Sequence, residues 1–296
     1  MSGVPGAFDR IGLVVHPRRD LDATLATIRA WAAEQGADVV QIAVDGQDRR
    51  VAPIADAAGC DLLIALGGDG TTLAALHAAA PAGRPVMGVA CGSLGALTAV
   101  HAGELEDALG SVAGGHWIPR RMPGLALEAN GTALGVALND VVVVRAGASQ
   151  VTVGIHVDGE LYVRFAGDGV IVATPLGSSA YTLAAGGPIL APGTDGLVVT
   201  PLAPHGGTCP PLVTGAASRV ELYVEPGWAG ARLELDGQVV PVDPRSLAAT
   251  WVPEYATLVS LGDTEALFAG LRRRRILVDS PRVQARDQRA AKPPAG

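Results

Sequence analysis

Hydrophobic positions follow two different patterns along the chain, and the change comes near residue 120. Before that point, apolar runs of strand length alternate with segments of helical spacing. Such an alternation predicts a parallel sheet covered by helices on both faces. In residues 20–35, for example, Leu21, Leu25 and Ile28 recur at helical spacing. The expected strands are residues 10–16, 37–44, 61–66 and 85–89, and the expected helices are residues 20–35, 51–59 and 73–80.

After residue 120 the apolar stretches become short and are separated by Gly, Asn and Asp. Many short strands at close spacing predict a largely antiparallel, β-rich domain. The sequence VDGE at residues 157–160 predicts a hairpin turn. The expected strands are residues 125–129, 135–144, 150–157, 160–165, 169–173, 197–201, 219–225, 231–235 and 257–261. We therefore expect an α/β domain over residues 1–120 and a β-rich domain over residues 121–261.

The end of the chain has a third character. Residues 265–275 are expected to be helical and finish in the run RRRR at 272–275, which is typical of a solvated helix end. Residues 284–296 are polar, with Ala and Pro, and we expect them to form a disordered tail.

Candidate chemistry lies in the stretch DLLIALGGDGTT at residues 61–72, where an apolar run ends in a glycine-rich turn before an Ala/Leu-rich segment. Because glycine has no Cβ, backbone N–H groups in such a turn can approach a phosphate, and the positive end of the next helix faces the same point. Asp69 is a candidate general base in this turn. A plain Asp-Gly turn without a ligand is the alternative. The turn is not a Walker loop, because the Gly-Lys-Ser/Thr ending is absent and the one lysine of the chain is Lys292.

Charge and composition exclude several classes of protein. A net charge of -7 argues against a nucleic-acid binder, although arginines, backbone N–H groups and a metal ion could still hold a small polyanion. Hydrophobic residues make up 49% of the chain, yet no uninterrupted apolar run reaches the length of a membrane span, and no secretory signal is visible. We therefore expect a cytoplasmic protein without a membrane partner. Cys60, Cys91 and Cys209 have no metal-ligand spacing, so no metal site is expected from them.

Three further stretches carry a family resemblance when they are read together with GGDGT. They are GVACGSLGALT at residues 88–98, ALNDVVVVR at 137–145 and DGVIVATPLGSSAYTLAAGGP at 168–188, and PLAPH at 201–205 and DGQ at 236–238 agree with them. In this order and spacing the chain resembles the NAD kinase family over residues 10–275. GGDGT alone is shared with lipid kinases and phosphofructokinases, whereas the long stretch at residues 174–188 is much more specific.

The resemblance implies a kinase that transfers the terminal phosphoryl group of ATP, or of polyphosphate in some members, to the adenosine ribose 2′-hydroxyl of NAD, giving NADP. It implies an N-terminal α/β domain, completed by residues 262–283, and an all-β C-terminal domain, with the active site between them. It further implies Mg²⁺, small-molecule nucleotide substrates and assembly as a homodimer or homotetramer.

The resemblance also assigns roles to individual residues. Asp69 would accept the hydroxyl proton, and the donor phosphates would be held by Gly67, Gly68, Gly70 and Thr71. The acceptor would be contacted by Asn139, Asp140, Asp168, Ser179, Ala180 and Tyr181. As alternatives from the residues alone, Asn139 and Asp140 could cap a turn, and Tyr181 could be a packed aromatic side chain.

Departures from the family pattern fall on the acceptor side. Ala90 and Ala96 stand where the family usually has Asn and Phe, Leu176 stands in place of Thr, and Asp140 in place of Glu. A kinase of the same fold that phosphorylates another nucleoside, nucleotide or sugar-like metabolite is therefore an alternative. A non-catalytic nucleotide sensor is a second alternative, and the intact Asp69 argues against it.

Overall fold

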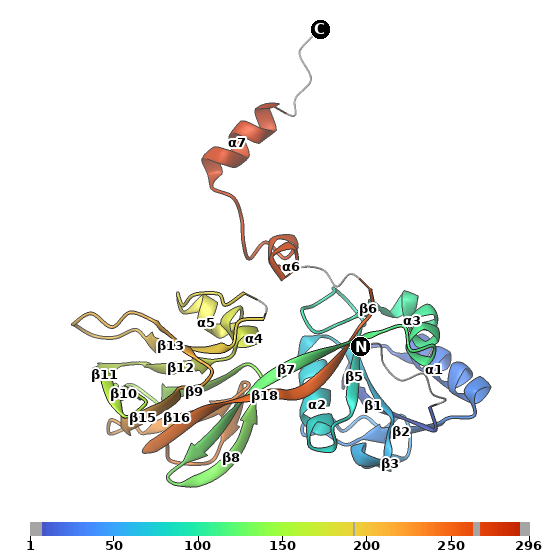
Figure 1. Ribbon diagram of the computed structural model, residues 1–296, viewed down its shortest axis with the longest axis horizontal. Helices are drawn as coiled ribbons and strands as arrows, with labels where there is room; N and C mark the ends of the chain where they lie inside the picture. Colours follow the sequence, from blue (N-terminus) through green and yellow to red (C-terminus); the bar gives the residue numbers. More distant parts are fainter. Residues whose placement is uncertain (1–7, 192, 263–266, 291–296) are drawn as a thin grey trace.

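The computed structural model describes residues 8–191, 193–262 and 267–290, which form two domains lying side by side (Figure 1). Within these residues the strands form a 12-stranded sheet, which passes through both domains, and a 6-stranded sheet in the second domain. No helix of the described part is long and apolar enough to cross a membrane. The predicted combination of an α/β domain and a β-rich domain is confirmed.

The first domain is built on parallel strands with the order β5-β4-β1-β2-β3, and β6 pairs with β5. Their bounds are β1 Arg10–Val15, β2 Asp38–Ile42, β3 Ile54–Ala55, β4 Leu62–Gly67, β5 Pro85–Ala90 and β6 Val100–His101. Helices α1 (Asp22–Gln35) and α3 (Leu105–Ala113) cover one face through Ile28 and Leu109, and α2 (Asp69–Ala79) covers the other through Leu76. Short 3₁₀ helices occupy Ala57–Gly59, Ala80–Ala82 and Ala102–Glu104.

The second domain is a sandwich of two antiparallel layers with one core between them. Leu127, Val153 and Leu222 enter this core from the large sheet, and Val143 and Leu197 enter it from the small sheet. Two short helices, α4 (Pro175–Ser178) and α5 (Tyr181–Ala184), follow β12. The strands are β7 Ile118–Ala129, β8 Thr132–Ala137, β9 Asp140–Arg145, β10 Val151–Val157, β11 Glu160–Gly167, β12 Gly169–Ala173, β13 Gly196–Leu202, β14 Leu212–Gly215, β15 Arg219–Glu225, β16 Ala231–Leu235, β17 Gln238–Val240 and β18 Ser246–Ser260.

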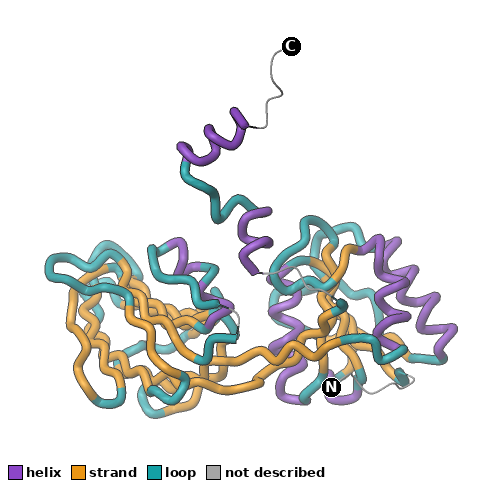
Figure 2. Tube along the Cα trace, turned by 45° about the horizontal axis from the view of Figure 1, so that its top comes forward, coloured by secondary structure: helices purple, strands orange, loops and turns teal. Residues whose placement is uncertain are grey.

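Strands β7 and β18 run through both domains as an antiparallel pair (Figures 1 and 2). The pairing extends from Leu247↔Ala129 in the second domain to Ser260↔Ile118 in the first, with an irregularity between Val252 and Ala256. At its end β18 also pairs in parallel with β5. The chain is therefore joined across the domains by regular sheet and not by a loose linker.

Three expectations about local structure are wrong. Residues 51–59 do not form one helix, because Gln41 binds the backbone of Arg49 and Val51 through its side chain and Pro53 through its N–H, which holds this segment beside β2. Residues 135–144 do not form one strand but are divided between β8, which ends at Ala137, and β9, which starts at Asp140. Residues 284–290, expected to be disordered, belong to α7 (Pro281–Ala290), while residues 291–296 lie outside the described residues.

The predicted hairpin at residues 157–160 is confirmed. Val157 pairs with Glu160, and Asp158 and Gly159 adopt positive φ angles of 53° and 82°. Helix α6 (Leu267–Arg273) corresponds to the helix expected over residues 265–275, and α7 projects away from both domains in both views (Figures 1 and 2).

Candidate active site

The glycine-rich turn lies at the carboxyl end of β4, where parallel sheets commonly bind ligands. Gly67 is the last residue of β4, Gly68 is extended at the helix N-cap, and Asp69 is the first residue of α2. The helix therefore begins four residues before the expected start at residue 73. Because the first-turn N–H groups of a helix have no carbonyl one turn back, the N–H groups around Gly70 and Thr71 form a potential anion site.

The Asp69 carboxylate is fixed by the loop that follows β5. One of its oxygens accepts a hydrogen bond from the N–H of Ala96 and the other from the N–H of Leu97, both at 2.9 Å. Gly95 lies so close that a Cβ at this position would collide with the carboxylate. The side chain of Asp69 is nevertheless 37% exposed. Each oxygen keeps a second lone pair, so the carboxylate can still accept a proton from a ligand.

Arginine side chains surround the same loop. Arg19 donates to the Cys91 carbonyl at 2.5 Å, and Arg120 donates to the Ala96 carbonyl at 3.3 Å. Burial lowers the pKa of Arg120 below its usual value, and the negative charge of Asp69 offsets part of this effect. The loop is thus held between cationic groups, which the sequence motifs did not indicate.

The predicted acceptor residues Asn139 and Asp140 lie on a turn that is organised by Asp236 of the DGQ motif. The Asp236 carboxylate accepts the N–H groups of Leu138 at 2.7 Å, Asn139 at 2.6 Å and Asp140 at 3.0 Å. It also lies 2.6 Å from Nε2 of His77, near the end of α2, and its side chain is 4% exposed. Asn139 and Asp140 do not have to cap this turn with their own side chains, because the Asp236 carboxylate already binds its N–H groups.

Asp140 is buried at the start of β9, beside two other carboxylates. Its pKa is raised from 3.8 to about 7, chiefly by desolvation and then by the charges of Asp236 and Glu234. An acid with such a pKa changes charge near neutral pH, which is characteristic of functional sites.

The specific stretch at residues 174–188 contacts the same turn. The Thr174 hydroxyl donates to the Leu138 carbonyl at 2.6 Å, and the Thr174 N–H donates to the Asn139 carbonyl at 2.9 Å. Gly177 lies against Asn139 with no room for a Cβ. Ser179 and Ala180 connect α4 to α5, and the side chain of Tyr181 is exposed, so Tyr181 is not an ordinary packed aromatic. The structure thus brings these predicted acceptor residues together.

Asp168 is separated from that group by β12. It precedes the strand and forms an ion pair with Arg145 at 2.7 Å, whereas Thr174 follows the strand. Six residues of extended chain span about 20 Å. Asp168 therefore lies far from Asn139 and Asp140 within one copy of the chain, and its role as an acceptor contact stays a prediction.

Helix α2 connects the glycine-rich turn at residues 67–71, the predicted donor turn, to the turn of Asn139 and Asp140, the predicted acceptor turn. It carries Asp69 at its start and His77 eight residues later, about 12 Å along the axis. Leu76 shares a hydrophobic cluster with Leu138, and Leu176 packs against that cluster. Leu176, which stands where the family usually has Thr, is thus a packing residue between the two turns.

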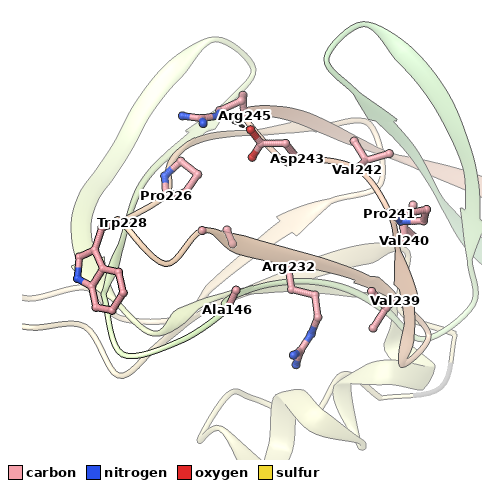
Figure 3. Close-up of a pocket in the computed structure, with 13 residues that line it drawn as sticks. Ala146, Pro226, Trp228, Arg232, Val239, Val240, Pro241, Val242, Asp243 and Arg245 are labelled. Carbon is pink, nitrogen blue, oxygen red and sulfur yellow. Dashed lines mark hydrogen bonds and ion pairs between the residues drawn. The ribbon is translucent and has the colours of Figure 1, made fainter.

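A separate hollow lies in the second domain (Figure 3). Trp228, Arg232 and Val239 line it, around the hairpin of β16 and β17. It contains none of the predicted site residues, so the chemistry is not placed there. No group of three or more His, Cys, Asp or Glu in the described part of the chain is arranged to hold a metal ion.

A glycine-rich turn at a helix N-terminus, at the carboxyl end of a parallel strand, is typical of α/β proteins that bind a phosphorylated ligand. Comparison with known proteins gives the family. The ATP-NAD kinase N-terminal domain model matches residues 12–116, and the ATP-NAD kinase C-terminal domain model matches residues 138–247.

Curated relatives agree with these models. NAD kinase of Desulforamulus reducens is 37% identical over 78% of this chain and 84% of its own, and NAD kinase 1 of Streptomyces avermitilis is 32% identical over 95% and 91%. This chain belongs to the NAD kinase family, and it is therefore a phosphotransferase with an alcohol acceptor.

Solved structures share the fold at lower identity. Yeast NADH kinase complexed with NADH superposes with a TM-score of 0.76 at 20% identity, covering 93% of this chain and 89% of that chain. An NAD kinase from Archaeoglobus fulgidus in complex with ATP gives 0.70 at 23% identity, covering 89% and 98%.

Proposed function

We propose that this protein transfers the terminal phosphoryl group of ATP to the 2′-hydroxyl of the adenosine ribose of NAD, giving NADP. The observation that carries the proposal is the position of Asp69, which lies at the start of α2 and is held by two N–H groups of the loop after β5. Family membership supports ATP as donor and a dinucleotide as acceptor.

The donor phosphates bind at the N-terminus of α2, between Gly67 and Thr71, where N–H groups and the helix dipole favour an anion. Mg²⁺ would enter this site bound to ATP, because it commonly binds through phosphate oxygens together with one or two protein carboxylates. Asp69 is the exposed carboxylate at this turn and would be its protein ligand. When bound, the ion neutralises negative charge on the transferring group.

Asp69 acts as general base in the transfer step. A bond forms between the ribose 2′ oxygen and the γ-phosphorus, and the bond from that phosphorus to the β–γ bridging oxygen breaks. The hydroxyl proton passes to the Asp69 carboxylate and then to solvent. Such a base contributes roughly 10²- to 10⁴-fold to the rate, and positioning by the loop and helix supplies much of the remainder.

Asn139, Asp140, Ser179, Ala180 and Tyr181 hold the acceptor. Their support is the network that joins Thr174 and Gly177 to the Asn139 turn. An ionised Asp140 can accept hydrogen bonds from ribose hydroxyls. We also propose the cytoplasm as the place of action and a homodimer or homotetramer as the assembly, on the ground of the family resemblance.

A second candidate function is the phosphorylation of a different acceptor. Ala96, beside Asp69, has no ring to stack on adenine, and Leu176 adds apolar volume next to the acceptor turn. These two positions favour a changed acceptor pocket, since a fold alone does not fix the substrate.

The experiment is an assay of the purified protein with Mg²⁺ and either ATP or polyphosphate, offering NAD, NADH and a panel of nucleosides, nucleotides and sugars, with detection of product mass. NADP formation supports the first candidate. Good phosphorylation of another acceptor, with little NADP, supports the second. Tight dinucleotide binding without any product indicates a nucleotide sensor and contradicts both.

A further inference from the structure

The run of arginines at residues 272–275 does not behave as one solvated helix end. Arg272 turns away and pairs with Asp279 at 2.6 Å. Arg273 donates to the Leu94 carbonyl at 3.3 Å, and Nη1 of Arg274 lies 3.9 Å from Oδ2 of Asp69. Two consecutive arginines of the C-terminal segment thus reach the loop and the carboxylate of the candidate active site.

Local structure fixes the position of Arg274. Leu271 in α6 is fully buried and anchors the helix. The N–H and Nε of Arg274 both donate to the Gly270 carbonyl, at 3.1 and 3.2 Å. Helix α6 ends at Arg273, and Arg275 in the turn that follows adopts a positive φ of 59°. The Arg274 side chain is 29% exposed, so its remaining N–H groups can reach a ligand while its backbone and Nε stay fixed.

Charge balance at the donor turn calls for such a group. The phosphates of ATP carry several negative charges and would bind next to the Asp69 carboxylate, which repels them. Helix N–H groups supply only partial positive charge. The part of the chain that the structure describes contains no lysine, so arginine is the side chain that can add full positive charge to that of the Mg²⁺ bound with ATP. A guanidinium can pair with two phosphate oxygens at once.

The contact between Arg274 and Asp69 leaves the guanidinium available. At 3.9 Å the two groups attract each other but are beyond hydrogen-bonding distance. Arg120 also donates to the Ala96 carbonyl in this loop, so Asp69 does not depend on Arg274 alone for a compensating charge.

We propose that Arg274 is a ligand of the donor phosphates, carried to the active site by the C-terminal helix α6, and that Arg273 holds the neighbouring loop in place. When ATP binds, the Nη groups of Arg274 pair with phosphate oxygens beside Asp69. This inference rests on the proposed function of the donor turn, but not on the identity of the acceptor.

The test compares the full-length protein with Arg274→Gln, Arg274→Lys and the matched control Arg272→Gln. Binding of Mg-ATP and of AMP is measured by calorimetry without any acceptor, and initial rates are measured with NAD in parallel. Arg274→Gln is expected to weaken Mg-ATP binding about 10- to 100-fold, as for the loss of a hydrogen bond to a charged group. The affinity of the Arg274→Gln variant for AMP and its KM for NAD should stay close to those of the unmodified protein.

Arg274→Lys should recover part of the Mg-ATP affinity, because it keeps the charge and loses the bidentate geometry. Arg272→Gln should bind Mg-ATP normally. Unchanged Mg-ATP binding in Arg274→Gln would overturn the inference. Equal loss in Arg272→Gln, or equal loss of AMP binding, would also overturn it, because either result indicates a general effect on α6. Mg-ATP binding without NADP formation by the unmodified protein would remove NAD as acceptor and leave the role of Arg274 standing.

Discussion

Nε2 of His77 lies 2.6 Å from a carboxylate oxygen of Asp236, and this contact joins helix α2 to the turn that carries Asn139 and Asp140. An ionised carboxylate only accepts hydrogen bonds, so Nε2 carries the hydrogen. Asp69 stands at the other end of the same helix. The contact therefore positions the acceptor turn relative to the donor turn.

Replacing Asp236 with Asn should destabilise the protein. The amide has one accepting oxygen in place of two, so at least one N–H of the turn would face an NH₂ group in a buried site. We expect the free energy of unfolding to fall by about 1–3 kcal/mol, measured by chemical denaturation. Asp243→Asn is the matched control, because Asp243 forms an exposed ion pair with Arg245, and it should cost about 1 kcal/mol or less. Equal losses in the two variants would refute a special role for Asp236.

The stability of the protein should fall as the pH rises from about 4 to about 7 through the ionisation of Asp140. Burial raises the pKa of Asp140 from the ordinary 3.8 to about 7 in the folded chain, so the folded state binds more protons than the unfolded state between these pH values. Stability is then lost with rising pH and levels off above pH 7. Asp140→Asn should remove this pH-dependent part of the free energy of unfolding. A shift of about three pKa units corresponds to at most about 4 kcal/mol, at roughly 1.36 kcal/mol per unit. Denaturation of both proteins at pH 5 and pH 8 measures it, and parallel curves would contradict the assignment.

Asp69→Asn should lower turnover roughly 10²- to 10⁴-fold while most of the Mg-ATP affinity is retained, because the amide oxygen can still ligate Mg²⁺ but the amide cannot act as a base. The amide also loses one of the two N–H bonds from Ala96 and Leu97, so a loss of about 1 kcal/mol in stability is expected beside the catalytic effect. Single-turnover rates at saturating substrate separate the two effects. Near-normal turnover would exclude Asp69 as the base.

Ala96→Phe should strengthen NAD binding if the acceptor is NAD. The two contacts of Ala96, to Asp69 and to Arg120, are made by its backbone and survive the substitution. A ring that lies against adenine would add about 0.5–1.5 kcal/mol, or roughly two- to tenfold in affinity. Ala96→Leu is the control for size without aromaticity. Weaker binding in both variants would favour a pocket shaped for another acceptor.

The parallel sheet of the first domain could be predicted from the sequence because its central strands β1, β4 and β5 are largely apolar runs. The long pair of β7 and β18 through both domains was not predicted, because charged residues interrupt β7. Strand β4 and the turn after it were predicted in this way, and the assignment of residues 174–188 to the acceptor, which the family resemblance implies, stays a prediction. The break between β8 and β9 was missed, because it depends on Asp236, which is distant in the sequence and binds the N–H groups of Leu138 and Asn139.

The cationic part of the site could not be predicted for the same reason. A run of four arginines looks uniform in the sequence, yet Arg272 and Arg274 point to different partners once α6 is anchored by Leu271. Residues 284–290 were misjudged because composition alone favoured disorder. Helix α7 begins at Pro281, directly after Ser280, and proline is common at the first position of a helix. Its described side chains at residues 281–287 are exposed.

The paired strands β7 and β18 form a two-stranded ribbon between the two halves of the molecule. The backbone hydrogen bonds along Ile118–Ala129 and Ser246–Ser260 hold the two strands to each other, and they do not hold one domain against the other. The ribbon therefore sets the distance between the halves, and the irregularity between Val252 and Ala256 is the place where it can bend. Any opening or closing of the halves around a nucleotide should accordingly turn about this short segment, and a cross-link that holds the halves in one position should slow turnover.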